Sequence, residues 1–181
     1  MPASQKHYFD HEDEGLSPET SHPNFVTLAP AMFYDPGDEF APFGSDDGHD
    51  TLRGLEEWFS KHGSTAVATD YLEALLTSWA LKIPARVWCL DAPKLIAWLG
   101  KTEMNEVFLA SEARARLATA LGELKITGSI SFSGLAEGRK GLAVLRISAA
   151  DTSRHPDWPY RDEALSALAD IGKVLDSAPI G

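Results

Sequence analysis

The charge of this chain is divided very unevenly along its length. The first fifty residues contain 11 Asp or Glu and a single Lys, and neither Lys nor Arg occurs between Lys6 and Arg53. The whole chain carries a net charge of −11, so residues 51–181 are almost neutral. Because like charges repel, an acidic segment without cations does not stabilise a compact fold, but it attracts a cationic partner or a metal ion.

Length and composition indicate one domain with a tail. With 181 residues, 44% of them hydrophobic, and five Trp, the chain can build a sizeable core. We expect residues 1–20 to form a flexible acidic arm with little to bury, and residues 21–181 to form a single globular domain. The stretch Val87 to Leu99 is too short and too interrupted to span a bilayer, and no apolar run near the start suggests a signal peptide.

The same counts narrow the possible partners and the compartment. A pI near 4.9 argues against nucleic acid and anionic membranes as direct partners, because both are negatively charged. The single Cys89 cannot form an internal disulfide, which suits the reducing cytoplasm. Its apolar neighbours predict a buried, unreactive thiol.

Apolar residues recur at helical spacing along most of residues 48–175, which predicts a mainly α fold of about five or six helices. Around Thr127-Gly128 the pattern alternates instead. This favours a short β-hairpin over 124–132, with a turn between helices as the alternative. The expected helices start near Gly48 and end at His62, and then cover 69–81, 92–99, 102–122, 133–148 and 160–175.

The residues before the first of these helices are irregular. Pro30 interrupts the apolar segment from Asn24 to Tyr34, so we expect an extended segment packed on the core. Asp35 to Ser45 contains several helix breakers and predicts an ordered loop. Asp46 or Asp47 is the expected N-cap of the helix near Gly48.

The loop string Phe40-Ala-Pro-Phe-Gly-Ser-Asp-Asp-Gly-His-Asp-Thr-Leu52, followed by Trp58, resembles the signature of the YfeS-like bacterial proteins. His22-Pro23 upstream and the later string from Ala118 to Ile130 are similar to further family features, although Leu121 stands where an aromatic residue is expected. Some relatives carry a WGR module, and no Trp-Gly-Arg occurs here. The resemblance implies a bacterial source and a small compact domain, but no reaction.

No catalytic, metal or cofactor motif emerges from the residues. The acidic loop fails as an EF-hand because Phe43 and Gly54 fall at the first and last ligand positions. His7 and His11 have metal-ligand spacing, but they lie in the expected arm. His49 and Asp50 have only Ser45, Ser60 and Ser64 near them in sequence, and none of these serines lies in a Gly-x-Ser-x-Gly turn.

The sequence therefore predicts a non-enzymatic protein-binding domain. More specifically, it suggests an immunity-type protein whose acidic loop occludes a basic bacterial toxin. The expected contact residues are acidic or aromatic: Asp35, Asp38, Glu39, Phe40, Phe43, Asp46, Asp47, Asp50 and Trp158. For Trp158, packing against the last helix is the competing expectation. Two alternatives remain: a metal-binding or catalytic domain that uses the carboxylates from Asp35 to Asp50, and an accessory domain with a housekeeping partner.

Overall fold

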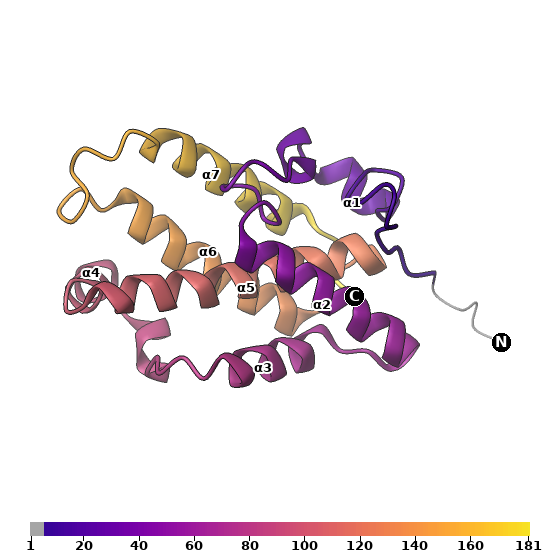
Figure 1. The fold of residues 1–181 in the computed structure, drawn as a ribbon, viewed down its shortest axis with the longest axis horizontal. Helices are drawn as coiled ribbons and strands as arrows, with labels where there is room; N and C mark the ends of the chain where they lie inside the picture. Colours follow the sequence, from indigo (N-terminus) through magenta and orange to yellow (C-terminus); the bar gives the residue numbers. More distant parts are fainter. Residues whose placement is uncertain (1–5) are drawn as a thin grey trace.

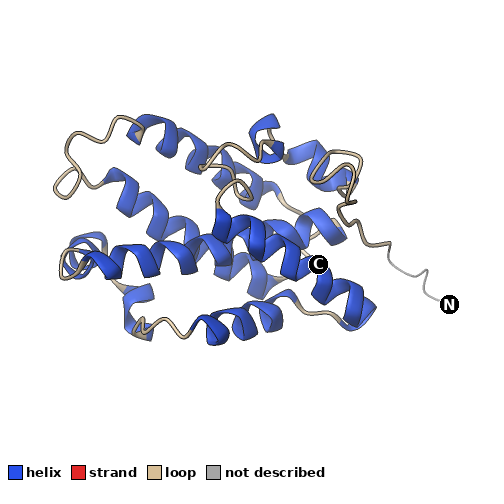
Figure 2. Ribbon diagram, viewed as in Figure 1, coloured by secondary structure: helices blue, strands red, loops and turns tan. Residues whose placement is uncertain are grey.

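A computed structural model describes residues 6–181, and helices dominate this part of the chain (Figures 1 and 2), which confirms the mainly α prediction. The α-helices are α1 (Pro23–Leu28), α2 (Asp46–His62), α3 (Ala68–Trp79), α4 (Ala92–Leu99), α5 (Glu103–Thr127), α6 (Phe132–Ala150) and α7 (Arg161–Ser177). Short 3₁₀ turns lie at Ala31–Tyr34, Gly63–Thr65 and Ala85–Cys89. None of the helices within residues 6–181 has the length and hydropathy of a membrane span.

Helices α5 and α6 form the centre of the fold. Helix α5 packs against α6 and α2, and to a lesser extent against α1, α3 and α4, while α7 packs against α6. Two glycines of α6 allow the central pair to approach closely. A Cβ at Gly141 would lie 2.3 Å from the carbonyl oxygen of Ala113, and a Cβ at Gly138 would lie 2.7 Å from the Cβ of Ala120. These glycines lower the helix propensity of α6, but they permit its packing on α5.

Helix α5 continues past the glycine at which the sequence predicted its end. A Cβ at Gly122 would lie 2.8 Å from Leu55 Cδ2, so Gly122 serves close packing on α2. The helix ends instead at Gly128, which has φ = 85°, a left-handed conformation that glycine adopts easily. The hairpin prediction is therefore wrong, and the turn alternative holds. In the described chain, Ile130 forms only an isolated bridge with Ile180.

The segment from Asn24 to Tyr34 is also more helical than expected. It forms α1 followed by a 3₁₀ turn, not an extended segment. His22 caps α1, because its Nδ1 accepts a hydrogen bond from the backbone N–H of Asn24 at 3.1 Å. Pro23 occupies the first helical turn, where its missing N–H costs nothing.

Residues preceding α1 close the C-terminal end of α5. The backbone N–H groups of Tyr8 and His22 donate to the carbonyl oxygens of Ile126 and Lys125, at 3.1 and 2.9 Å. These carbonyls belong to the last turn of α5 and have no partner within the helix. Helix α5 is thus capped by a segment more than a hundred positions earlier in the chain.

A buried ion cluster fixes the same segment. The ammonium group of Lys125, whose side chain is fully buried, contacts the carboxylates of Asp10, at 2.7 Å, and Glu56. The side chain of Asp10 is only 2% exposed, and it also accepts a hydrogen bond from Thr20 Oγ1 at 3.0 Å. The expectation that the arm has little to bury does not fit these residues. The part of that expectation that concerns residues 1–5 lies outside the described residues.

Candidate functional site

The acidic loop before α2 is held in shape by its own aspartates. The side chain of Asp35 accepts a hydrogen bond from the N–H of Gly37 at 2.8 Å, and the side chain of Asp38 accepts one from the N–H of Phe40 at 2.9 Å. Such contacts between an Asp and the backbone two residues later stabilise turns. Asp35 and Asp38 therefore have a structural role in the loop.

The loop folds back on itself at two glycines. A Cβ at Gly44 would lie 1.9 Å from the carbonyl oxygen of Asp38, and a Cβ at Gly48 would lie 2.2 Å from that of Pro42. Only glycine allows these approaches. They bring the whole acidic string close to the start of α2.

The N-cap of α2 is Ser45, not Asp46 or Asp47 as expected. The Oγ of Ser45 accepts a hydrogen bond from the N–H of Gly48 at 3.2 Å. Asp46 and Asp47 follow in the first turn, where the helix dipole favours negative charge. Neither carboxylate is needed as the cap, so both remain available for other contacts.

The aromatic residues of the loop do not share one environment. Phe43 is 2% exposed and packs in the core with Phe25, at a ring-centroid distance of 6.3 Å. Phe43 is therefore a core residue and not the surface anchor that the sequence suggested. Phe40 is half-buried, and its ring meets that of Trp158 edge-on, with centroids 6.1 Å apart. The loop is thus pinned to the core by Phe43 and contacts the segment before α7 through Phe40.

The acidic segment keeps most of its charge. Within residues 6–181, two carboxylates of the first fifty residues form ion pairs with Lys or Arg: Asp10 with Lys125, and Asp47 with Arg114. The exposed carboxylates of Glu39, Asp46 and Asp50 form no such pair in this part of the chain. The described part of the N-terminal quarter, residues 6–50, therefore keeps carboxylates that no Lys or Arg of the described chain neutralises.

Most of the basic residues of α5 and α6 near this loop pair with carboxylates outside it. Arg116 contacts Glu112 and Glu137, and its guanidinium lies 4.1 Å above the centroid of the Trp88 ring. Lys140 pairs with Glu137 at 2.6 Å. Arg139 pairs with Asp176 at 3.0 Å. Of these basic residues, Arg114 is the one that reaches the acidic loop.

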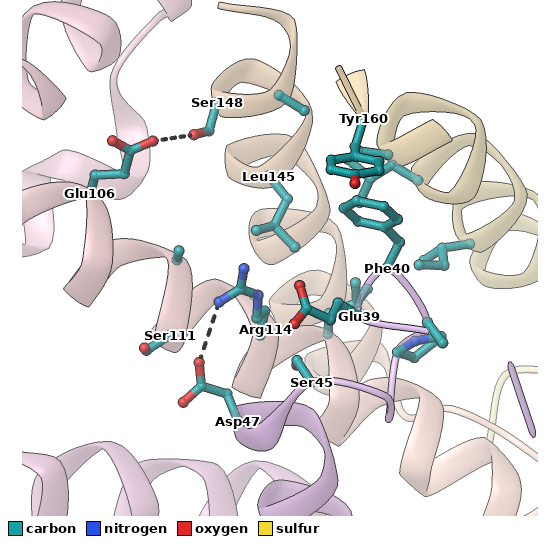
Figure 3. A pocket seen from close by; sticks show the side chains of 18 of the residues that line it. Glu39, Phe40, Ser45, Asp47, Glu106, Ser111, Arg114, Leu145, Ser148 and Tyr160 are labelled. Atoms are coloured by element: carbon teal, nitrogen blue, oxygen red, sulfur yellow. Dashed lines mark hydrogen bonds and ion pairs between the residues drawn. The ribbon is translucent and has the colours of Figure 1, made fainter. Parts of the chain in front are cut away.

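A cleft of about 620 Å³ opens beside the loop (Figure 3). Its walls come from the acidic loop, α5, α6 and the start of α7. The deeper lining is apolar and includes Leu117, Leu145, Leu168 and Ile171. A cleft of this size with an apolar lining and a few polar groups is typical of a binding site.

Ion pairs lie at two places along the cleft. Asp47 Oδ2 lies 3.5 Å from Arg114 Nη1, a contact that joins α2 to α5 (Figure 3). Elsewhere in the lining, the carboxylate of Glu106 on α5 contacts Arg154 at 2.9 Å and His155 at 3.0 Å. The contacts of Glu106 with Arg154 and His155 fix the loop before α7 to α5, so they hold these two walls of the cleft together.

The structure brings only some of the predicted site residues to this cleft. Glu39, Phe40, Asp47 and Trp158 line it. The remaining predicted contact residues do not line it: Asp35, Asp38, Phe43, Asp46 and Asp50. Sequence reasoning missed Glu106, Arg114, Leu145, His155 and Tyr160 as residues of the cleft. The residues of the cleft come from four separate stretches of the chain, and no local pattern connects them.

The structure does not bring the two histidines with metal-ligand spacing together at one site. His7 packs edge-on against Phe59, with ring centroids 5.3 Å apart, while His11 is exposed. Within residues 6–181, no group of three or more His, Cys, Asp or Glu side chains is placed to hold a metal ion. Cys89, expected to be buried, is exposed on the 3₁₀ turn before α4.

The local roles of Ser45 and Asp47 predict different costs of substitution. We expect Ser45→Ala to lower the free energy of unfolding by about 1 kcal/mol, because the N-cap hydrogen bond is lost. Asp47→Asn removes only a partly exposed ion pair and should cost less than about 1 kcal/mol. Urea denaturation of both variants measures the difference. A cost for Asp47→Asn above that of Ser45→Ala would show that the Arg114 pair is a main support of the loop.

The chain has a curated bacterial relative. It is 33% identical over 150 residues to the "Uncharacterized protein YfeS" of Escherichia coli (strain K12), and the match covers 80% of this chain and 58% of that protein. The chain thus spans less than two thirds of the length of this relative. Neither a protein-family model nor a solved structure matches the chain. The match confirms the resemblance to the YfeS-like proteins.

Proposed function

We propose that this chain, a YfeS-like protein, is a protein-binding domain. It uses an acidic face, formed by Glu39, Asp46 and Asp50, and the adjoining cleft to bind a basic protein. One observation carries the proposal: the exposed carboxylates of Glu39, Asp46 and Asp50 lack ion pairs within residues 6–181, and they lie on the same loop and helix start that border an apolar-lined cleft. Charge without internal compensation is a cost to the folded chain, which a cationic partner removes.

The carboxylates and the apolar lining of the cleft contribute to binding in different ways. The carboxylates raise the rate at which a basic protein finds the surface, because complementary charge steers diffusional encounter. The apolar lining of the cleft then supplies the contact that slows dissociation, since buried apolar anchors dominate the energy of an interface. Phe40 and Trp158, whose rings meet edge-on, both contribute to this lining.

The more specific proposal is an immunity-type inhibitor of a basic bacterial toxin. An inhibitor of this kind must capture its target quickly, and opposite charge accelerates encounter by orders of magnitude. Enzymes that act on nucleic acid grip phosphate with Lys and Arg. Carboxylates that pair with those cations would occlude the phosphate-binding surface of the toxin. An accessory domain with a housekeeping partner would use the same surface, so a functional assay separates the two.

The experiment compares two variants with the same change in net charge. The first, Glu39→Gln/Asp46→Asn/Asp50→Asn, neutralises the proposed face. The second, Glu57→Gln/Asp70→Asn/Glu73→Gln, neutralises three exposed carboxylates that do not line this cleft. In affinity capture from the source bacterium, we expect the unsubstituted chain and the second variant to retain a basic protein that the first variant loses.

The captured protein is then produced alone and together with this chain. Growth arrest by the protein alone, relieved by co-expression with this chain, is the result that the inhibitor proposal requires. A harmless captured protein would reject inhibition and leave the binding proposal standing. Equal capture by both triple variants would reject the binding proposal, because charge at the acidic face would then have no special role.

A further inference from the structure

We infer that the cleft receives a segment of the partner in which an aliphatic side chain stands beside a Lys or Arg, and that Arg114 takes the place of that cation in the free protein. This inference rests on the proposed function and specifies what the cleft accepts. The juxtaposition that supports it is an exchangeable ion pair, Asp47 with Arg114, at the edge of an apolar recess.

Apolar side chains form most of the lining of the cleft. The floor contains Leu117, Leu145 and Leu168, and the lining also includes Val107 and Tyr160, whose side chains are exposed to solvent. Val107 is 54% exposed and Tyr160 is 57% exposed, values that place both among the large hydrophobic residues left open by the fold. An aliphatic side chain that enters the cleft would lose contact with water and pack on this apolar lining.

The cationic part lies against the same lining. Arg114 projects from α5 with 43% of its side chain exposed, and Asp47 projects from the first turn of α2 with 28% exposed. Their separation of 3.5 Å marks an ion pair at the surface, which contributes little to stability. An incoming Lys or Arg can therefore replace Arg114 at low cost. Glu39 also lines the cleft and has no ion pair in the described chain, so it offers a second carboxylate.

Charge also selects against other occupants. A second copy of this chain carries a net charge of −11, which opposes its approach to an acidic cleft. An acidic or neutral apolar segment would fill the floor but leave Glu39 without a cation. At Glu106 the situation differs, because Arg154 and His155 already occupy that carboxylate. The side chain of Arg154 is 14% exposed and that of Arg114 is 43% exposed, so the pair at Asp47 is the one that an incoming cation can exchange more easily.

The test uses short synthetic peptides with blocked ends and one repeating pattern: Lys with Leu, Lys with Ser, and Glu with Leu. Binding is followed by backbone amide shifts in NMR spectra of the folded protein. We expect the Lys–Leu peptide to shift the cleft residues. The Lys–Ser peptide should bind about ten- to a hundredfold more weakly, because it lacks the buried Leu. The Glu–Leu peptide should not bind.

Arg114→Gln tests the exchange directly. Because the internal cation is removed and Asp47 is freed, this variant should bind the Lys–Leu peptide about two- to fivefold more tightly than the unsubstituted protein. Arg114 is partly exposed, so the substitution leaves the fold intact. Unchanged or weaker binding by Arg114→Gln would overturn the inference, as would equal affinity for the Glu–Leu peptide.

A variant whose cleft is filled by a large side chain provides a second test. Ala110→Trp places a large side chain on the α5 wall and should weaken binding of the Lys–Leu peptide at least about tenfold. Ala169→Trp makes the same change at an exposed position of α7 outside the cleft and should leave binding unchanged. If the captured partner depends on Glu39, Asp46 and Asp50 but is indifferent to Arg114→Gln and Ala110→Trp, the proposed function stands and this inference fails. Loss of dependence on the three carboxylates rejects the proposed function itself.

Discussion

Replacing Lys125 with Met is expected to lower the free energy of unfolding by about 3–5 kcal/mol, because the buried carboxylate of Asp10 would lose its cation and that of Glu56 would keep only a longer contact with Arg53, at 3.8 Å. The Lys125 side chain is fully buried, and water cannot take its place without opening the contact between the N-terminal segment and α5. Denaturant unfolding followed by far-UV circular dichroism measures the loss.

Two further variants show whether the cost comes from the buried charges. Lys173→Met removes an exposed partner of Asp170 and should change stability by less than about 1 kcal/mol. Lys125→Met combined with Asp10→Asn and Glu56→Gln removes all three charges and should recover much of the stability that Lys125→Met alone loses. Near-neutral behaviour of Lys125→Met would show that the cluster is open to solvent.

Replacing Phe43 with Ala is expected to cost about 3–5 kcal/mol, although Phe43 lies in the acidic loop. Its ring is buried against Phe25, and removing it leaves a cavity beneath the loop. The neighbouring Phe40→Ala is the matched control. Phe40 is only half-buried, so its loss should cost clearly less and should instead weaken binding of a partner at the cleft.

Unfolding free energies of the two variants, measured under the same conditions, decide the assignment. Equal costs, or a larger cost for Phe40→Ala, would contradict the division of the loop into a core anchor and a cleft wall. The division matters for function because a rigid loop holds its carboxylates in place before a partner arrives, and preorganisation reduces the entropic cost of binding.

Local signals were sufficient for elements that begin and end within a few residues of a cap. Helix α4 runs over Ala92–Leu99, as the sequence predicted, because Asp91 caps its first turn and Gly100 follows its last residue. Helices α2 and α7 were found with boundaries shifted by about two residues, as is usual where a helix end frays. The resemblance to YfeS-like proteins agrees with the relative that is 33% identical over 150 residues.

Contacts between distant segments could not be read in the same way. Gly122 was predicted to end a helix. It lies instead in the interior of α5, where it faces Leu55 of α2. Asp10 looked like part of a solvated acidic run, but its cation is Lys125, more than a hundred residues later. In each case a local preference was overruled by a tertiary partner that periodicity does not reveal.

The residues that line the cleft also depend on contacts between distant segments. Glu39 and Asp47 were chosen for their charge, and both line it. Asp46 and Asp50 were chosen for the same reason and do not line it, since only some positions of a helix turn face the cleft. Arg114 belongs to the site because α5 passes beside the start of α2, which is a property of the fold and not of its local sequence.

An open acidic face that is met by a basic partner should make association depend on ionic strength. Stopped-flow experiments measure the association rate constant with the captured partner over a range of salt concentrations. For the unsubstituted chain and for Glu57→Gln/Asp70→Asn/Glu73→Gln, we expect rates that fall steeply as salt rises. For Glu39→Gln/Asp46→Asn/Asp50→Asn, we expect a rate at low salt that is at least about tenfold lower and depends less on salt. An association rate that is independent of ionic strength, or equal for the two triple variants, would show that the acidic face does not steer the partner.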